Sequence, residues 1–128
     1  MSTVGSVNGV YISEDLNYTL TVTDNNPSPG IFKGSFVSHS TLTGGVNYDE
    51  IFGQYRFVAD DQQWPAQISF YSILTASPRK HVIADSWNGI RTADGNIIMS
   101  GVRTYTTKEG LYDIYTFEKI IFKLTPTT

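Results

Sequence analysis

The sequence contains no cysteine and few charged residues. None of its 128 residues is Cys, which excludes disulfides, thiolate metal ligands and cysteine nucleophiles. Charged residues make up 16%, whereas about 25% is typical of globular proteins. Nine basic and twelve acidic residues give a formal net charge of −3. Duplex nucleic acid and anionic membranes both need a basic face, so we expect neither as a partner.

Long apolar runs and a secretory leader are also missing. Ile97–Met99 and Ile120–Phe122 are among the longest apolar runs, and they are far too short to span a bilayer. The first seven residues lack the basic and apolar regions of a signal peptide. We expect a soluble, cytoplasmic protein unless a signal peptide has been removed. The length predicts one domain over residues 1–128, with short flexible ends at about 1–7 and 125–128.

The motifs of the common catalytic and cofactor sites are absent. His39 and His81 do not have the spacing of metal ligands. The sequence has no nucleophile elbow, no dinucleotide-binding glycine pattern and no phosphate loop. We therefore expect no metal and no cofactor, and the residues favour a binding module over an enzyme.

What the sequence does have is aromatic residues and a strand-like alternation. Aromatic residues make up 13%, and so much apolar surface calls for a ligand pocket or a subunit interface in addition to a small core. Apolar and polar side chains alternate in short stretches that are separated by turn residues. The predicted strands are residues 9–13, 17–24, 31–38, 50–58, 65–74, 80–90, 96–105 and 114–124.

Eight antiparallel strands with short connections predict an all-β, up-and-down barrel. Closure of the sheet removes the edge strands that would otherwise pair with other chains. The interior of an eight-stranded barrel holds packed side chains or one small ligand. A sandwich of two sheets is the alternative architecture.

Asp85 and Arg103 are charged residues within predicted strands. Asp85 precedes Trp87 by two residues, so both side chains lie on one strand face. If that face is the barrel interior, the Asp85 carboxylate needs a hydrogen-bond partner there. Arg103 could then pair with Asp85 or with a ligand carboxylate. The alternative is that both side chains point outward as ordinary surface residues.

Short motifs along nearly the whole chain resemble those of the avidin and streptavidin family, in the same order. They are Gly9–Ser13, Gly30–Phe36, Gly53–Tyr55, Trp87–Ile90 and Phe122–Leu124. The resemblance implies an eight-stranded barrel that assembles into homodimers or homotetramers and binds biotin inside the barrel. In the family, polar residues surround the ureido ring of biotin, and tryptophans surround its thioether ring and tail.

The resemblance and the strand pattern together give the candidate ligand-binding residues. These are Ser13, Tyr18, Phe36, Ser38, Phe70, Asp85, Trp87, Arg103 and Tyr112. Tyr112 falls near the position of the tryptophan that a neighbouring subunit lends to the family's pocket.

Several of these positions depart from the family's biotin chemistry. Phe36 lacks the hydroxyl of the family's tyrosine, Tyr18 replaces a much smaller serine, and Ile120 falls near an acceptor aspartate. Each lost polar contact to the ligand is worth on the order of 1.5–3 kcal/mol, so we expect weak or absent biotin binding.

Three functional hypotheses follow. The first is a non-catalytic barrel for a small ligand, with a rebuilt or closed pocket. The second is a small cyclase-like or isomerase-like enzyme that folds its substrate in the barrel, with Asp85 or Arg103 polarising it. The third is an oligomer that binds sugars or proteins through loops, with the loop at Gly44 and Gly45 as the candidate. The fold alone cannot choose among them.

Overall fold

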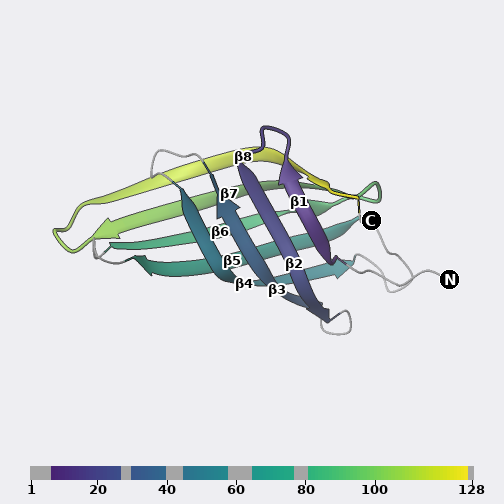
Figure 1. Ribbon diagram of the computed structural model, residues 1–128, viewed down its shortest axis with the longest axis horizontal. Coiled ribbons are helices and arrows are strands. Elements are labelled where there is room, and N and C mark those ends of the chain that lie inside the picture. The colour runs from purple at the N-terminus through teal and green to yellow at the C-terminus, as the bar shows by residue number, and fades with distance from the viewer. Residues whose placement is uncertain (1–6, 27–29, 40–44, 58–64, 77–80, 127–128) are drawn as a thin grey trace.

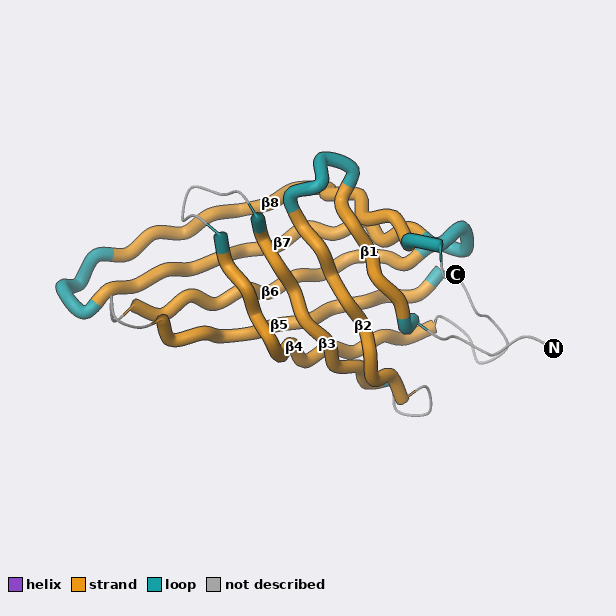
Figure 2. The backbone as a smooth tube through the Cα atoms, viewed as in Figure 1, coloured by secondary structure: helices purple, strands orange, loops and turns teal. Residues whose placement is uncertain are grey.

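The computed structural model describes residues 7–26, 30–39, 45–57, 65–76 and 81–126. Its strands are β1 (Gly9–Ser13), β2 (Tyr18–Asn26), β3 (Ile31–Ser38), β4 (Val46–Phe57), β5 (Ala66–Ala76), β6 (His81–Arg91), β7 (Asn96–Thr107) and β8 (Tyr112–Leu124). Each strand pairs antiparallel with the next, and β8 pairs with β1 to close the barrel (Figure 1). The predicted closed barrel is confirmed, and the sandwich alternative is wrong. The part of the chain that the structure describes contains no helix (Figure 2).

The strand alternation follows from residue type. In β3, Phe32 and Phe36 are buried, whereas Ile31 and Lys33, the two neighbours of Phe32 in the strand, are exposed. The predicted ends of β1 and β3 agree with the structure. The main difference is the start of β4, which lies at Val46 rather than at residue 50. The ends of β2, β5 and β7 and the start of β8 each extend two residues beyond the predicted strands. Polar residues fill the early part of β4, because one side of it faces solvent.

Strands β5–β8 are longer than β1–β3 and project beyond them at one end of the barrel (Figure 1). Strand β1 pairs with β8 only at Phe122–Leu124, and β4 pairs with β5 only as far as Tyr71. The ends of the four long strands therefore form an open, four-stranded projection. The connection between β7 and β8 lies at its tip.

Register shifts interrupt three of the strand pairs, and those in β4 and β8 change which side chains of the candidate site face the barrel interior. Gly34 pairs with Ile51 and Phe36 with Tyr48, so β4 advances three residues where β3 advances two. In the same way, β8 has an extra residue between Phe117 and Ile120. An extra residue moves the following side chains to the other face of the strand. The bulges turn Tyr48 and Phe117 toward the interior.

The chain ends are partly fixed by the barrel. Val7 is fully buried, and its carbonyl accepts a hydrogen bond from the Tyr11 hydroxyl at 2.9 Å. Thr125 donates its backbone N–H to the carbonyl of Val10 at 2.8 Å. Residues 1–6 and 127–128, which complete the two predicted flexible ends, lie outside the described residues.

Candidate ligand site in the barrel lumen

Eight of the nine predicted site residues are buried. Ser13, Tyr18, Phe36, Ser38, Phe70, Asp85, Trp87 and Arg103 are between 0% and 7% exposed. They come from six strands, β1, β2, β3, β5, β6 and β7, which the closed sheet brings together. Of the two orientations that the sequence left open for Asp85 and Arg103, the structure has the inward one.

Six aromatic rings form one cluster inside the barrel. They belong to Tyr18, Phe36, Phe70, Trp87, Phe117 and Phe122, and we call them the aromatic cluster. Trp87 stacks with Phe117 at a centroid distance of 5.0 Å and with Phe70 at 6.2 Å. Phe36 lies 5.3 Å from Trp87. Trp87, Phe36 and Phe122 have no exposed surface, so these rings fill the volume around them.

Gly101 on β7 makes room for the Trp87 indole. A Cβ atom at Gly101 would lie 2.4 Å from the Cδ2 atom of Trp87, which is too close for any side chain. Gly101 and Trp87 are cross-strand partners, so the ring lies directly over the glycine backbone. The glycine thus sets the orientation of the central ring of the cluster.

The Asp85 carboxylate accepts four hydrogen bonds from three side chains. Arg103 donates from Nε to Oδ1 at 2.7 Å and from Nη2 to Oδ2 at 2.9 Å. Tyr48 donates its hydroxyl to Oδ1 at 2.7 Å, and Trp87 donates Nε1–H to Oδ2 at 3.0 Å. Four donors use all the lone-pair positions that a carboxylate offers. We call these four residues the Asp85 network.

Arg103 makes further contacts besides its two bonds to Asp85. Its Nη1 lies 3.4 Å from the Ser38 hydroxyl, which accepts a weak hydrogen bond. Its guanidinium carbon lies 5.2 Å from the Phe117 ring centroid, in the range of a cation–π contact. Burial alone would lower the pKa of Arg103, but its hydrogen bonds to Asp85 raise it, so the guanidinium stays charged.

Burial and the neighbouring carboxylate keep the tyrosine hydroxyls neutral. Burial, followed by the hydrogen bond to Asp85, raises the pKa of Tyr48 far above its ordinary value. Burial also raises the pKa of Tyr18. Both hydroxyls therefore act as neutral groups at physiological pH, and neither is a candidate for an ionised nucleophile.

The Ser13 hydroxyl makes its hydrogen bonds within the connection between β1 and β2. Its hydroxyl donates to Asp15 Oδ1 at 2.7 Å and accepts the backbone N–H of Tyr18 at 3.0 Å. The first of these bonds lowers the pKa of Asp15. Ser13 therefore closes the turn between β1 and β2 with both of its hydrogen bonds.

Tyr112 is separated from the other candidates. It is 76% exposed at the start of β8, on the open projection rather than in the lumen of its own barrel. In the same projection, Leu111 is 67% exposed and Ile114 is 62% exposed.

The sequence analysis missed Tyr48 and Phe117. Strict alternation from Ile51 and Phe122 puts both on the outer face, and only the bulges bring them inside. The available signals were two adjacent charged residues in each strand, Asp49-Glu50 and Glu118-Lys119, which break the alternation. Lys119 has a φ of 52°, a conformation that is uncommon for residues with a side chain.

The described lumen offers hydrogen bonding and packing rather than reactive groups. Within the described residues, no group of three or more His, Asp or Glu side chains is placed to hold a metal ion. Asp85 and Arg103 are already paired with each other. No helix in the described ranges is long and apolar enough to cross a membrane.

Comparison with known proteins finds a likeness in structure. No protein-family model matches the sequence, and no curated protein matches it. The crystal structure of core-bradavidin matches with a TM-score of 0.61 and 14% sequence identity. The match covers 92% of this chain and 99% of that chain. The resemblance predicted from short motifs is therefore confirmed for the fold: this chain is a divergent β-barrel of the avidin-like fold.

Proposed function

We propose that this protein is a non-catalytic barrel for a small ligand, with a lumen rebuilt by its own side chains and with weak or absent biotin binding. One observation carries the proposal: Asp85 receives all four of its hydrogen bonds from Tyr48, Trp87 and Arg103. A polar network that satisfies itself has no need of a polar ligand at that depth. The rest of the lumen is lined by aromatic rings that pack on one another, so a ligand has to rearrange them and should be small and largely apolar.

Three lumenal positions support the loss of biotin binding. Phe36 is fully buried against Trp87 and offers no donor to a ureido oxygen. The Tyr18 ring lies 6.1 Å from the Phe36 ring, in space that a serine would leave open. Ile120 packs against the core and has no group that could accept a ureido N–H.

The enzyme hypothesis finds less support in the geometry. A general base or an electrostatic catalyst needs a free lone pair or donor that is directed at the substrate. Asp85 has none left, and Arg103 spends Nε, Nη1 and Nη2 on protein atoms. The loop hypothesis depends on Gly44 and Gly45, of which Gly44 lies outside the described residues.

We further propose that the protein is a homo-oligomer, a dimer or a tetramer. The exposed Leu111, Tyr112 and Ile114 at the projecting end of β7 and β8 support it. Three large apolar side chains on a projecting tip are typical of a contact with another subunit. Because this tip extends past its own barrel, it reaches toward the barrel of a neighbouring subunit. In the oligomer, Tyr112 would then line the ligand site of that subunit.

Two measurements test these proposals. Isothermal titration with biotin should give no binding in the submicromolar range, and a submicromolar Kd would contradict the rebuilt-lumen proposal. Native mass spectrometry of the gently purified protein should show an oligomer that carries a small molecule. Oligomers without any added mass would contradict ligand binding, and a monomer at micromolar concentration would contradict assembly. Tyr112→Ala should weaken the oligomer while leaving the barrel folded.

A further inference from the structure

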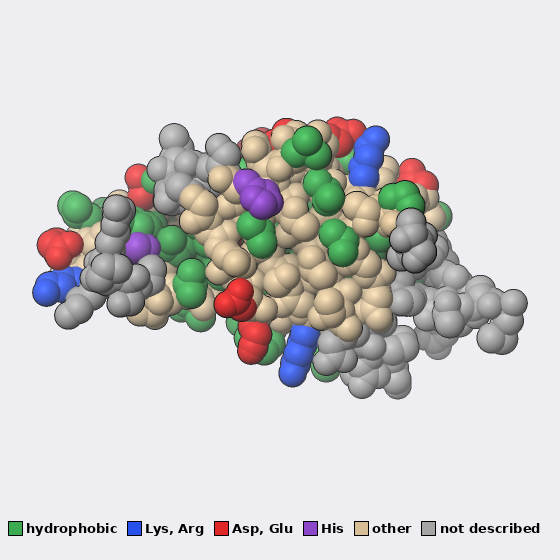
Figure 3. Space-filling model, viewed as in Figure 1, with side chains coloured by type: hydrophobic (Ala, Val, Ile, Leu, Met, Phe, Trp, Pro, Cys, Tyr) green, Lys and Arg blue, Asp and Glu red, His purple; other side chains and the backbone are tan. Residues whose placement is uncertain are grey.

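Tyr18 lies at one end of the barrel lumen. Because each strand pairs antiparallel with the next, the connections that follow β1, β3, β5 and β7 lie at the same end of the barrel, which we call the mouth. Tyr18 is the first residue of β2, directly after the β1–β2 connection. Glu14, Asp15 and Leu16 in that connection are exposed, and Figure 3 shows acidic and apolar side chains at the upper edge of the molecule, where the connection lies. Tyr18 therefore stands between the lumen and the solvent.

The ring of Tyr18 and its hydroxyl have different surroundings. The ring packs against four other rings of the aromatic cluster, at centroid distances between 5.7 and 6.3 Å: Phe36, Trp87, Phe117 and Phe122. Within the described residues the hydroxyl makes no hydrogen bond, and its oxygen is open to solvent. By contrast, the buried tyrosines Tyr11 and Tyr48 both donate their hydroxyls to protein atoms.

No hydrogen bond holds the Tyr18 side chain in place, although its backbone is fixed. The backbone N–H donates to Ser13 Oγ at 3.0 Å, and the residue pairs with Ser38 on β3. A change of side-chain rotamer therefore takes the ring out of the lumen without disturbing the strand. Within the described residues that change breaks no hydrogen bond, and it loses only packing.

The rings deeper in the aromatic cluster are enclosed. Phe36, Phe70 and Phe122 are between 0% and 2% exposed, so no path to solvent is open to them. Trp87 is also fully buried, and its displacement would break the hydrogen bond to Asp85. A ligand that enters from the mouth must therefore displace a ring other than these four.

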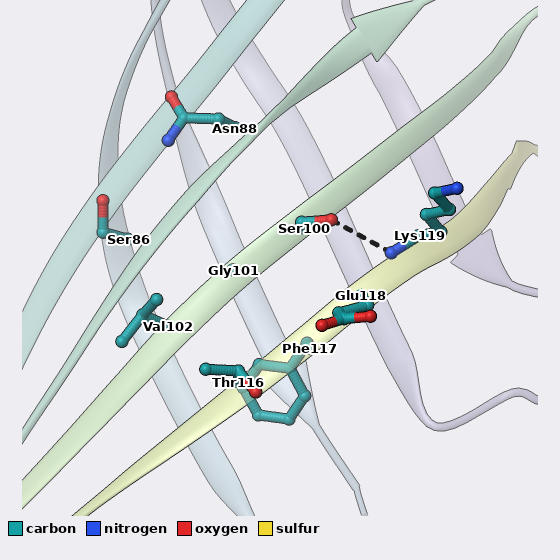
Figure 4. Close-up of a pocket in the computed structure, with 9 residues that line it drawn as sticks. All are labelled: Ser86, Asn88, Ser100, Gly101, Val102, Thr116, Phe117, Glu118 and Lys119. Carbon is teal, nitrogen blue, oxygen red and sulfur yellow. Dashed lines mark hydrogen bonds between the residues drawn. The ribbon is translucent and has the colours of Figure 1, made fainter.

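Phe117, the other ring next to the mouth, is held by several contacts. It stacks on Trp87 at a centroid distance of 5.0 Å, and the guanidinium of Arg103 lies 5.2 Å from its centroid. The bulge that turns it inward is fixed by the backbone N–H of Lys119, which donates to the Ser100 hydroxyl at 3.0 Å (Figure 4). Of the six rings, that of Tyr18 is thus displaced at the least cost.

We infer that the Tyr18 ring is a displaceable plug in the ligand site, and that the ligand is a small neutral phenol. The inference rests on the proposed ligand binding in the lumen and names the ligand class for it. The space that the plug leaves is the size of one aromatic ring, and its walls are aromatic rings, on which a planar ring packs well. A ligand hydroxyl at the mouth remains in water, as that of Tyr18 does.

Size and charge exclude the nearest alternatives. A ligand with two fused rings would have to displace a second, enclosed ring of the cluster. A carboxylate in this space would be buried without a counterion, because Arg103 is already paired with Asp85. A cation would lie close to the buried guanidinium of Arg103, which already occupies the Phe117 ring.

The test is titration of the wild-type protein, Tyr18→Ala and Tyr18→Phe with p-cresol and with 4-hydroxybenzoate, monitored by amide chemical shifts. In the wild-type protein the apparent Kd for p-cresol is raised by the small fraction of molecules whose plug is displaced. Tyr18→Ala removes the plug and should bind p-cresol about tenfold more tightly or better. Tyr18→Phe is the matched control, because it keeps the ring and should bind no more tightly than the wild-type protein. The anionic 4-hydroxybenzoate should bind about tenfold more weakly than p-cresol or worse.

A second measurement needs only the wild-type protein, so it does not depend on the folding of a variant. In protein with ¹³C-labelled tyrosine, p-cresol should shift the ring signals of Tyr18. The ring signals of Tyr55 should not move, because Tyr55 lies near the end of β4 that is farthest from the mouth.

Four results would overturn the inference. They are equal affinity of Tyr18→Ala and the wild-type protein for p-cresol, equal affinity for the two ligands, p-cresol binding that leaves the Tyr18 ring signals unchanged, and binding by Tyr18→Ala alone. The last result would make the ring a permanent part of the core. If p-cresol fails while native mass spectrometry shows another small molecule on the protein, only the ligand class is wrong. The absence of any bound molecule would instead contradict the proposed function.

Discussion

Asp85 on β6 and Arg103 on β7 are cross-strand partners and form an ion pair that is fully enclosed by the barrel. The Nε–Oδ1 distance is 2.7 Å, and both side chains have 0% exposure. A buried pair of this kind contributes little net stability compared with apolar residues of the same volume. Its importance lies in what happens when one partner is removed.

Removal of one charge should destabilise the protein strongly. Arg103→Met leaves the Asp85 carboxylate buried without its counterion, so we expect the free energy of unfolding to fall by about 3–5 kcal/mol. Urea denaturation measures this change. Lys123→Met is the matched control, because Lys123 forms an exposed pair with Glu14 at 3.4 Å and its loss should cost at most about 1 kcal/mol. Equal losses in the two variants would contradict the network described here.

Tyr48→Phe tests the third donor to Asp85. The substitution removes one hydroxyl and leaves a buried carboxylate oxygen with one donor fewer, which should cost about 1–3 kcal/mol of unfolding free energy. Tyr115→Phe removes a similar bond, to Asp113 at 3.2 Å, on the exposed part of β8. That control should change stability by less than about 0.5 kcal/mol. If Tyr48→Phe left the free energy of unfolding unchanged, the Tyr48 hydroxyl would contribute nothing to stability, and this prediction would be contradicted.

Stability should decline at alkaline pH. The pKa of Tyr48 and that of Tyr18 are raised in the folded protein above the ordinary tyrosine value of 10.0. Above that pH the unfolded chain loses the protons that the folded protein retains, so stability is fully present below pH 10 and is lost as the pH rises. Urea denaturation at a series of pH values measures the slope, which Tyr48→Phe should reduce. An unchanged slope would contradict the raised pKa of Tyr48.

Phe36→Ala tests whether aromatic rings occupy the ligand's place in the lumen. Removing this fully buried ring should leave a cavity and cost about 3–5 kcal/mol of unfolding free energy. The cavity should bind a small apolar probe such as benzene more tightly than the wild-type lumen does. Thermal denaturation with and without benzene measures both effects. Leu111→Ala, at a residue that is 67% exposed, is the control and should change stability by less than about 0.5 kcal/mol.

The sequence predicted most of the barrel because local alternation carries that information. Phe32 and Phe36, or Ile51 and Tyr55, are spaced by even numbers of residues and lie on one face of a strand, as the pleat requires. The same spacing put Asp85 and Trp87 together, and their hydrogen bond follows from that shared face. The inward or outward choice was open, since alternation identifies two faces without saying which one is the core.

The bulges could not be located from alternation alone. An extra residue in β4 and another in β8 reverse the facing of Tyr48 and Phe117. The adjacent charged residues break the alternation there, but only the register against the partner strand shows where the extra residue lies. For this reason the sequence analysis found the acceptor Asp85 but not its donor Tyr48. It found the central ring of Trp87 but not the ring of Phe117 that stacks on it.

By itself, the sequence determined the absence of thiol chemistry, the low charge, the aromatic surplus and the succession of short alternating strands that closes into a barrel. These are properties of composition and of local spacing. Tertiary structure decided which face of each strand points inward, that Asp85 meets Arg103 and Tyr48, and that the Tyr18 ring joins the aromatic cluster. The physical reason is that pairing register and bulges are relations between strands far apart in the chain, and no single strand encodes them.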